Sequence, residues 1–212
     1  MEPVFSQGDV VLFQGDSITD CDRSRSDSLS LGNGYAQMIT GLFQAKYPEL
    51  SVTFYNRAIS GNRSIDLVER WDEDCIALKP DWISILIGIN DTWRYFDRGE
   101  KTETWEFEEN YRSILEDVRL NTKAGLILCE PFVLPCPDDR AAWRGDLDAK
   151  IHVVRSFARE YGAIYVPFDG IFAQAATRQL PDYWAADGVH PTAAGHALMA
   201  MNWLSAVNCT LG

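Results

Sequence analysis

The chain lacks any apolar segment approaching the ~20 residues that a membrane-spanning helix needs. Residues 1–6 also lack the basic start and the apolar centre of a secretory signal. Basic side chains are few, because 31 acidic residues against 19 Lys and Arg give a net charge of −12. This charge favours solubility and argues against nucleic acids or anionic membranes as the main partner. The sequence therefore predicts a cytoplasmic protein that binds neither nucleic acid nor a membrane.

Disulfide and zinc-binding patterns are missing as well. The cysteines are five, an odd number, and their scattered spacing matches neither a disulfide framework nor a zinc motif. We therefore expect mostly buried free thiols and no metal site. Repeats and low-complexity segments are also absent. A chain of 212 residues, 46% of them hydrophobic, can form one sizeable core, so we expect a single domain over residues 1–212. A homo-oligomer is left open.

Short apolar runs alternate with amphipathic stretches along the chain. The predicted strands are residues 9–14, 51–56, 82–88, 125–130 and 163–167, and the predicted helices are residues 34–46, 64–77, 105–121, 146–161 and 192–206. This repeated β-α order indicates a parallel sheet with helices on both faces. We predict a three-layer α/β/α, flavodoxin-like fold with a central five-stranded parallel sheet. In such folds chemistry gathers beyond the carboxyl ends of the strands.

One candidate nucleophile lies at such a strand end. Residues 10–13 form the apolar run typical of a buried parallel strand, and Gly15-Asp16-Ser17 follows it. A turn there would present the hydroxyl of Ser17 beyond the sheet. Serine and aspartate are also the usual residues of turns and helix N-caps. This segment alone therefore does not decide whether Ser17 is a nucleophile or only a turn or cap residue.

A candidate general base lies near the other end of the chain. Asp187 precedes His190 by three residues, which is close enough for its carboxylate to accept the Nδ1 proton while Nε2 stays free. A serine hydroxyl is a weak nucleophile at neutral pH and needs such a base, with a third group to orient the imidazole. Ser17, His190 and Asp187 supply these three roles.

Acyl transfer also needs hydrogen-bond donors for the oxyanion, and two segments offer them. Gly61 follows a strand-like run and would let a backbone N–H approach a ligand closely. Asn90 follows another and carries a side-chain amide donor. Each residue also has a purely structural interpretation: Gly61 as a turn glycine and Asn90 as a helix cap.

These segments together resemble the SGNH hydrolases, also called the GDSL-like lipases and esterases. The four matching blocks are Gly15-Asp16-Ser17, the segment with Gly61, Gly88-Ile89-Asn90-Asp91 and Asp187-Gly188-Val189-His190. The resemblance implies that Ser17, Asp187 and His190 form a catalytic triad. It also implies an oxyanion hole built from the N–H groups of Ser17 and Gly61 and the side chain of Asn90. No metal or organic cofactor is expected.

Two details favour a carbohydrate substrate. Ile18-Thr19 stands where the lipase-like members carry leucine, which looks more like the carbohydrate esterases. The stretches 13–20 and 88–94 are similar to bacterial acetylxylan esterases of the family, which remove acetyl groups from xylose units. The resemblance therefore implies a serine esterase that deacetylates xylo-oligosaccharides or related carbohydrates, with an acetylated saccharide as its partner.

Tryptophans next to the catalytic blocks point the same way. Trp93 and Trp184 lie beside the oxyanion segment and the triad acid, and sugar rings dock well on such flat apolar surfaces. The alternative is that they fill the core, which we expect of Trp71 and Trp143. The predicted substrate-binding residues are Asp16, Trp93 and Trp184.

Two other classes of function compete with a serine esterase. A metal-dependent phosphatase would use Asp16 as its nucleophile. Such an enzyme needs a second carboxylate two residues later, but position 18 is isoleucine. A glycan-binding module would keep the fold without turnover, but the complete catalytic set argues against it. Within the esterases, a general short-chain esterase, a lysophospholipase and a thioesterase remain alternatives. The absence of a Gly-x-Ser-x-Gly elbow separates them all from α/β-hydrolases without ranking them.

Overall fold

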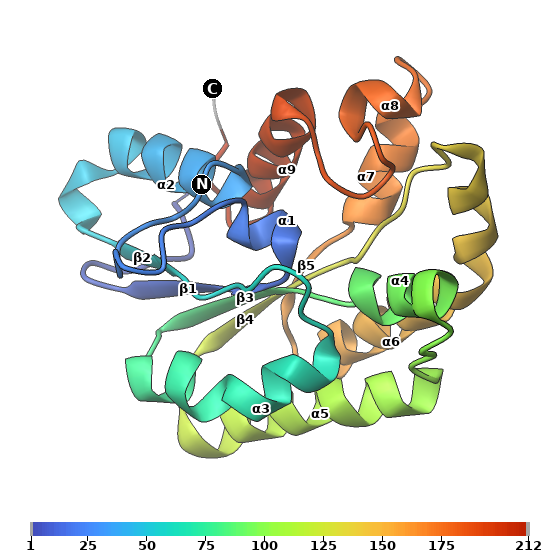
Figure 1. Cartoon of the computed structure of the whole chain (residues 1–212). Coiled ribbons are helices and arrows are strands. Elements are labelled where there is room, and N and C mark those ends of the chain that lie inside the picture. Colours follow the sequence, from blue (N-terminus) through green and yellow to red (C-terminus); the bar gives the residue numbers. More distant parts are fainter. Residues whose placement is uncertain (1, 211–212) are drawn as a thin grey trace.

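A computed structural model describes residues 2–210, in which a parallel sheet lies between two layers of helices (Figure 1). The strands are β1 (Val10–Gly15), β2 (Thr53–Asn56), β3 (Trp82–Leu86), β4 (Gly125–Cys129) and β5 (Ile164–Val166). They pair in the order β2-β1-β3-β4-β5, and every neighbouring pair is parallel. The predicted three-layer fold with a five-stranded parallel sheet is confirmed.

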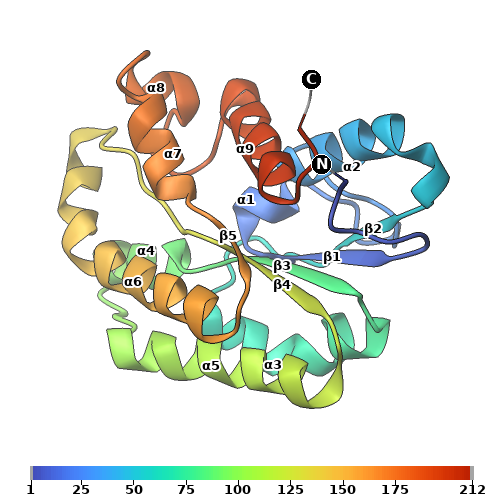
Figure 2. The same ribbon diagram turned by 180° about the vertical axis from the view of Figure 1, so that it is seen from behind.

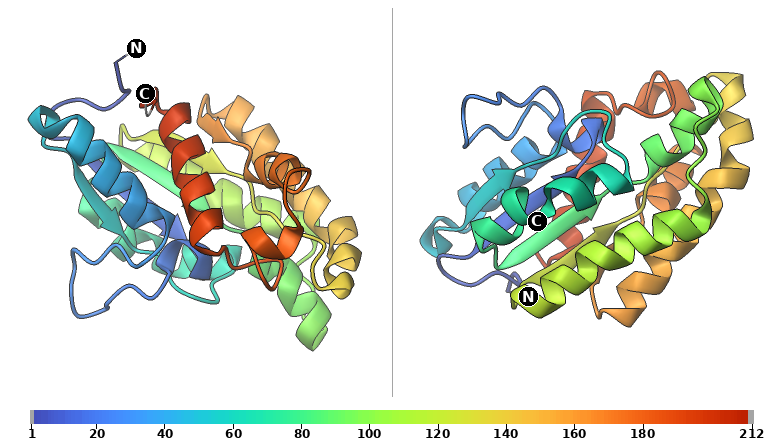
Figure 3. Two further views of the ribbon diagram at one scale, coloured as in Figure 1. Left: turned by 90° about the horizontal axis from the view of Figure 1, so that it is seen from above. Right: turned by 60° about the horizontal axis from the view of Figure 1, so that its bottom comes forward.

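The helices divide between the two faces of this sheet. Their bounds are α1 (Ser17–Asp20), α2 (Tyr35–Lys46), α3 (Ser64–Asp74), α4 (Ile89–Arg98), α5 (Thr104–Asn121), α6 (Arg144–Glu160), α7 (Phe168–Ala175), α8 (Pro181–Trp184) and α9 (Ala193–Ala206). Short 3-10 helices span Pro48–Leu50, Ile76–Leu78 and Asp138–Trp143. Helices α2 and α9 lie side by side on one face, and α3 and α5 lie on the other (Figures 2 and 3).

The central strands β1, β3 and β4 are largely apolar without alternation because both sides of the sheet are covered there. In β1, Val11, Leu12 and Phe13 are all fully buried. Val11 and Phe13 pack into the core under α2 and α9, and the Phe13 ring lies 5.5 Å from that of Trp203 on α9. Leu12 points to the opposite core, under α3 and α5. Each face of the sheet therefore has its own hydrophobic core.

Helix α5 illustrates how the outer layer is anchored. Its buried residues Phe107, Tyr111, Ile114, Leu115 and Val118 recur at the three- and four-residue spacing of one helix face. That face packs into the core beneath β3 and β4. Within the described residues, no helix is long and apolar enough to cross a membrane.

The ten elements predicted from the sequence are present, with ends that differ by at most three residues. Helices α1, α4, α7 and α8 were not predicted. Two of them matter for the site, because α1 begins at Ser17 and α4 begins one residue before Asn90. The Gly-Asp-Ser segment, predicted as a turn, thus continues directly into a helix.

The parallel sheet gathers distant segments at one edge. Ser17 follows β1, Gly61 lies in the loop after β2, and Asn90 follows β3. Strands β1 and β3 are neighbours, with Gly15 in register with Leu86. A Cβ atom on Gly15 would collide with the carbonyl oxygen of Leu86, so this position needs glycine. The three segments therefore meet at the carboxyl ends of adjacent strands.

Candidate active site

Ser17, His190 and Asp187 form a continuous hydrogen-bonded chain. Ser17 Oγ lies 2.9 Å from His190 Nε2, and His190 Nδ1 lies 2.6 Å from Asp187 Oδ2. This pattern fits the tautomer with the proton on Nδ1, which leaves Nε2 free to accept the serine proton. The side chains of His190 and Asp187 are 45% and 42% exposed, so the chain of groups opens to the surface.

Hydrogen bonds tune the protonation of the Asp187–His190 pair. Burial opposes the charge on Asp187, but bonds from the His190 ring and from the backbone N–H groups of His190 and Val189 outweigh it. They hold the pKa of this carboxyl well below its usual range. The bond to Asp187 raises the pKa of His190 above its usual value, against partial burial, which lowers it. Asp187 is therefore an ionised partner that favours the imidazolium.

The loop that carries Asp187 and His190 is held at both ends. Gly188 has a φ of +80°, and a Cβ atom there would collide with the carbonyl oxygens of Leu134 and Cys136. The Gly188 carbonyl also accepts a hydrogen bond from the Leu134 N–H at 2.8 Å. Beyond His190, the Thr192 hydroxyl caps α9 by accepting from the Gly195 N–H at 3.2 Å. These contacts set the position of the imidazole relative to Ser17.

Three potential donors surround the hydroxyl of Ser17. Within residues 2–210, the backbone N–H groups of Ser17 and Gly61 have no hydrogen-bond acceptor, which leaves them available to a ligand. Asn90 Nδ2 donates to the carbonyl of Asn62 at 3.0 Å and keeps a second N–H. Because Asn62 directly follows Gly61, this bond ties the loop after β2 to the start of α4.

Two buried aspartates accept hydrogen bonds from the residues on either side of Gly61. Asp20 on α1 accepts hydrogen bonds from the backbone N–H and the hydroxyl of Ser60, at 2.8 and 2.9 Å. Asp91 on α4 accepts from the hydroxyl of Ser64 at 2.6 Å and from its backbone N–H. Burial raises the pKa of Asp91 to about 6, against the Ser64 bonds, which lower it. The loop carrying Gly61 is thus clamped at both ends by carboxylates.

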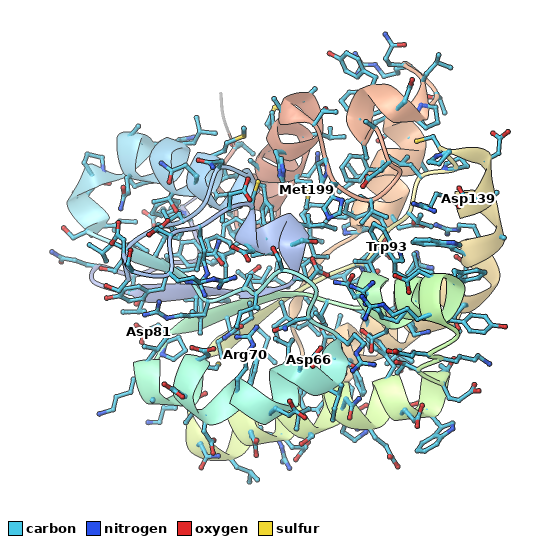
Figure 4. The ribbon with its side chains drawn as sticks, in the orientation of Figure 1. Asp66, Arg70, Asp81, Trp93, Asp139 and Met199 are labelled. Carbon is cyan, nitrogen blue, oxygen red and sulfur yellow. The ribbon has the colours of Figure 1, made fainter. Side chains whose placement is uncertain are left out.

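A small cavity of about 190 Å³ lies in front of Ser17. Its lining residues are Ser17, Gly61, Asn90, Trp93, Arg94 and His190. The ring of Trp93 lies 5.8 Å from that of His190, in the N-terminal half of α4 (Figure 4). Trp93 is backed by buried Trp143 and by the guanidinium of Arg140, which lies 5.2 Å from the Trp93 ring. The cavity thus joins the candidate nucleophile, base and oxyanion donors.

Two of the predicted substrate-binding residues do not line this cavity. Asp16 is fully buried, and its Oδ1 accepts the Ile18 N–H at 3.0 Å as the N-cap of α1. Its Oδ2 has no partner within residues 2–210, and burial raises the pKa of Asp16 to about 7. Trp184 is partly buried against the core. Burial of Asp16 does not support substrate contact or a nucleophilic role for this residue, whereas substrate contact by Trp184 stays a prediction.

Sequence reasoning missed Asp20, Asp91, Arg94 and Arg140. Recognition of α4 would have found two of them, because residues three and four apart on a helix share a face. Arg94 follows Asn90 by four residues and Asp91 sits in the first turn. Asp20 and Arg140 carried no such signal, since Ser60 and Trp93, the partners that link them to the site, are distant in sequence.

A model of the GDSL-like lipase/acylhydrolase family matches residues 13–198. The chain belongs to this family. Among its relatives, an acetylxylan esterase from Geobacillus stearothermophilus is 40% identical over 204 residues, which cover 93% of each protein. The family resemblance inferred from the four sequence blocks is confirmed.

Solved structures of family members have the same fold. A candidate GDSL-like lipase from Parabacteroides merdae superposes with a TM-score of 0.92 at 35% identity, over 97% of this chain and 98% of that one. A variant of Axe2, the acetyl xylan esterase from Geobacillus stearothermophilus, gives 0.89 at 36% identity over 99% of both chains. Three further Axe2 structures are described as catalytic mutants, in which a serine, an aspartate or a histidine is replaced by alanine.

Proposed function

We propose that this protein is a serine esterase that removes acetyl groups from acetylated xylo-oligosaccharides or related carbohydrates. The 40% identity to an acetylxylan esterase over 93% of the chain supports this substrate class. We further propose that Ser17, His190 and Asp187 are its catalytic residues. The serine, histidine and aspartate replaced in the Axe2 mutants are the residue types found here in one hydrogen-bonded chain.

The observation that carries the acetyl preference is the size of the cavity. Its volume of about 190 Å³ corresponds to roughly six water molecules at ~30 Å³ each. An acetyl group fits such a space, whereas a long acyl chain would largely exceed it. The triad opens to the surface, so a bulky sugar can remain outside while its ester reaches Ser17.

The mechanism follows from the positions of these groups. His190 Nε2 takes the proton of Ser17 as its oxygen attacks the acetyl carbonyl carbon, and Asp187 stabilises the imidazolium that forms. The N–H groups of Ser17 and Gly61 and the amide of Asn90 hold the oxyanion. The C–O bond to the sugar breaks, and the leaving oxygen takes the proton from His190. Water, deprotonated by His190, then attacks the acetyl-enzyme, and acetate leaves as Ser17 regains a proton.

Alternative substrates within the family differ in the acyl chain or the leaving group. A general short-chain esterase, a lysophospholipase and a thioesterase would use the same triad. A glycan-binding module without turnover would not need a general base beside Ser17. The hydrogen bond between Ser17 and His190 therefore argues against this alternative. Location in the cytoplasm, the organisation of residues 1–212 as one domain and any homo-oligomer remain predictions.

The proposal is tested by comparing acetylated and octanoylated xylo-oligosaccharides as substrates, with a chelator present throughout. We expect kcat/KM for the acetyl ester to exceed that for the octanoyl ester by more than about tenfold, because a cavity of about 190 Å³ leaves little room for the extra methylenes. A preference for the octanoyl ester would instead indicate a lipid-like substrate. Loss of all activity in chelator would favour a metal-dependent hydrolase.

A further inference from the structure

Helix α4 presents two neighbouring side chains to the cavity, and only one of them was expected there. Trp93 lies close to His190, with 5.8 Å between the centres of the two rings. Arg94 lies on the side of Gly61: a Cβ atom built on Gly61 would be 3.9 Å from Arg94 Nη2. An ester bound at Ser17 would therefore have an aromatic face on one side and a guanidinium on the other.

The guanidinium of Arg94 is held in place by one hydrogen bond, and its other donors have no partner among residues 2–210. Nη1 donates to Asp97 Oδ2 at 2.7 Å, one turn further along α4. Nη2 and Nε have no acceptor among residues 2–210, although the side chain is only 20% exposed. A guanidinium carries five donors, and partly buried donors cost free energy when they stay unpaired. The free edge of Arg94 is thus a prepared donor site beside Gly61.

The surroundings indicate which acceptor this donor fits. The charge of Arg94 is balanced by Asp97, and the chain carries a net charge of −12, so an anionic ligand gains little here. In the proposed mechanism the acetyl carbonyl oxygen is already held by the donors of Ser17, Gly61 and Asn90. The acceptors left for Arg94 are therefore the neutral oxygens of the alcohol part of the ester.

We infer that Arg94 is a substrate-binding residue that donates from its free edge to a hydroxyl or ring oxygen of the sugar bearing the acetyl group. This inference rests on the proposed function and deepens it. With Trp93 against the apolar face of the ring, Arg94 distinguishes acetylated sugars from acetyl esters of alcohols that lack such oxygens. Its contribution is to specificity, since it takes no part in the proton transfers.

The test compares an acetylated xylo-oligosaccharide with p-nitrophenyl acetate, whose leaving group lacks sugar oxygens. Arg94→Met keeps much of the side-chain length and removes every donor, and Arg94→Ala serves as a second variant. For both we expect kcat/KM to fall roughly 10- to 100-fold on the saccharide, the loss typical of one hydrogen bond from a charged donor. On the aryl acetate we expect a change within about twofold.

Arg98→Ala is the matched control. Arg98 lies on the same helix and approaches the same Asp97 at 3.8 Å, but its side chain is 60% exposed and does not line the cavity. We expect this variant to keep both activities. Hydrolysis of the aryl acetate by the Arg94 variants also reports that they are folded.

Two results would overturn the inference in an active enzyme: equal losses on both substrates, or an unchanged kcat/KM on the saccharide. Equal losses would assign Arg94 to the oxyanion or to the fold. If the wild-type protein hydrolyses the aryl acetate but not the saccharide, the proposed carbohydrate substrate itself fails, and this inference fails with it. The wild-type measurement therefore separates the two failures.

Discussion

At the scale of single residues, the short bond between Asp187 and His190 is the contact that we expect to govern the pH dependence of the proposed catalysis. Only the neutral imidazole can accept the proton of Ser17, and the bond to ionised Asp187 favours the protonated form. The pKa of His190 is therefore raised above its ordinary value of 6.5. Activity depends on the deprotonated fraction, so it increases as the pH rises through this pKa.

We predict that the acidic limb of the kcat/KM profile has its midpoint above pH 6.5. Asp187→Asn should move this midpoint to lower pH, because the imidazolium loses its charged partner. It should also lower kcat by up to about 10⁴-fold, because an amide no longer selects the Nδ1 tautomer. The measurement is a set of pH–rate profiles, with Asp182→Asn on α8 as the control. An unmoved midpoint in Asp187→Asn would contradict this role.

Asp16 yields a second prediction, on stability. Its folded pKa is raised from 3.8 to about 7, so the folded state binds the proton more tightly than the unfolded state. The stability that its neutral form provides is therefore complete below pH 3.8 and is lost as the pH rises to about 7. Asn at position 16 keeps an acceptor for the Ile18 N–H without this loss.

Relative to wild type, Asp16→Asn should therefore gain free energy of unfolding between pH 4 and pH 7, on the order of 4 kcal/mol from the size of the pKa shift. Above that window the difference should stay level. Urea unfolding at several pH values measures it. A difference that is the same at pH 4 and pH 8 would show that the carboxyl of Asp16 titrates normally.

At the scale of elements, two of the three proposed oxyanion donors, Gly61 and Asn90, come from segments that are joined by polar bonds. Gly61 lies on the loop before α3, and Asn90 lies in the first turn of α4. The segments are held together by Asn90 to the carbonyl of Asn62 and by Asp91 to Ser64. The distance between the two donors thus depends on these bonds and less on either segment alone.

We predict that Asp91→Ala lowers both stability and turnover. It leaves the buried N–H of Ser64 without an acceptor, which costs about 1–3 kcal/mol of unfolding free energy. It also loosens the loop against α4, so kcat for an acetyl ester should fall more than KM rises. Asp91→Asn retains one acceptor and should recover part of kcat. Stability loss with an unchanged kcat in Asp91→Ala would limit Asp91 to a structural role.

At the scale of the whole molecule, the sheet was predictable because burial on both faces leaves a local signature. Continuous apolar runs such as residues 10–13 can belong only to covered strands or buried helices, and their length favours strands. The Asp187–His190 pair was also predictable from neighbouring residues, because the two side chains are only three residues apart in the sequence. Long amphipathic helices such as α5 were also predictable, because their apolar residues recur at the spacing of one helix face.

The features that were missed depend on contacts between distant segments. Helix α4 is preceded by Gly88 and has an Asn-Asp pair in its first turn. These residue types are typical of turns, so the sequence pattern did not indicate a helix there. Asp16 was predicted to contact substrate, but the structure buries it completely. Arg94 lines the cavity because it lies on α4, the unpredicted helix that follows β3. None of these outcomes is visible in a window of neighbouring residues.

The central claim is that Ser17 is the nucleophile, and Ser17→Ala tests it most directly. Acetate release from an acetylated xylo-oligosaccharide would be measured for wild type and variant, with matching thermal unfolding to show an intact fold. We predict that kcat falls by several orders of magnitude, because Ser17 carries the only hydroxyl among the residues that line the cavity. Acetate release by folded Ser17→Ala at a rate near that of wild type would contradict the entire mechanism.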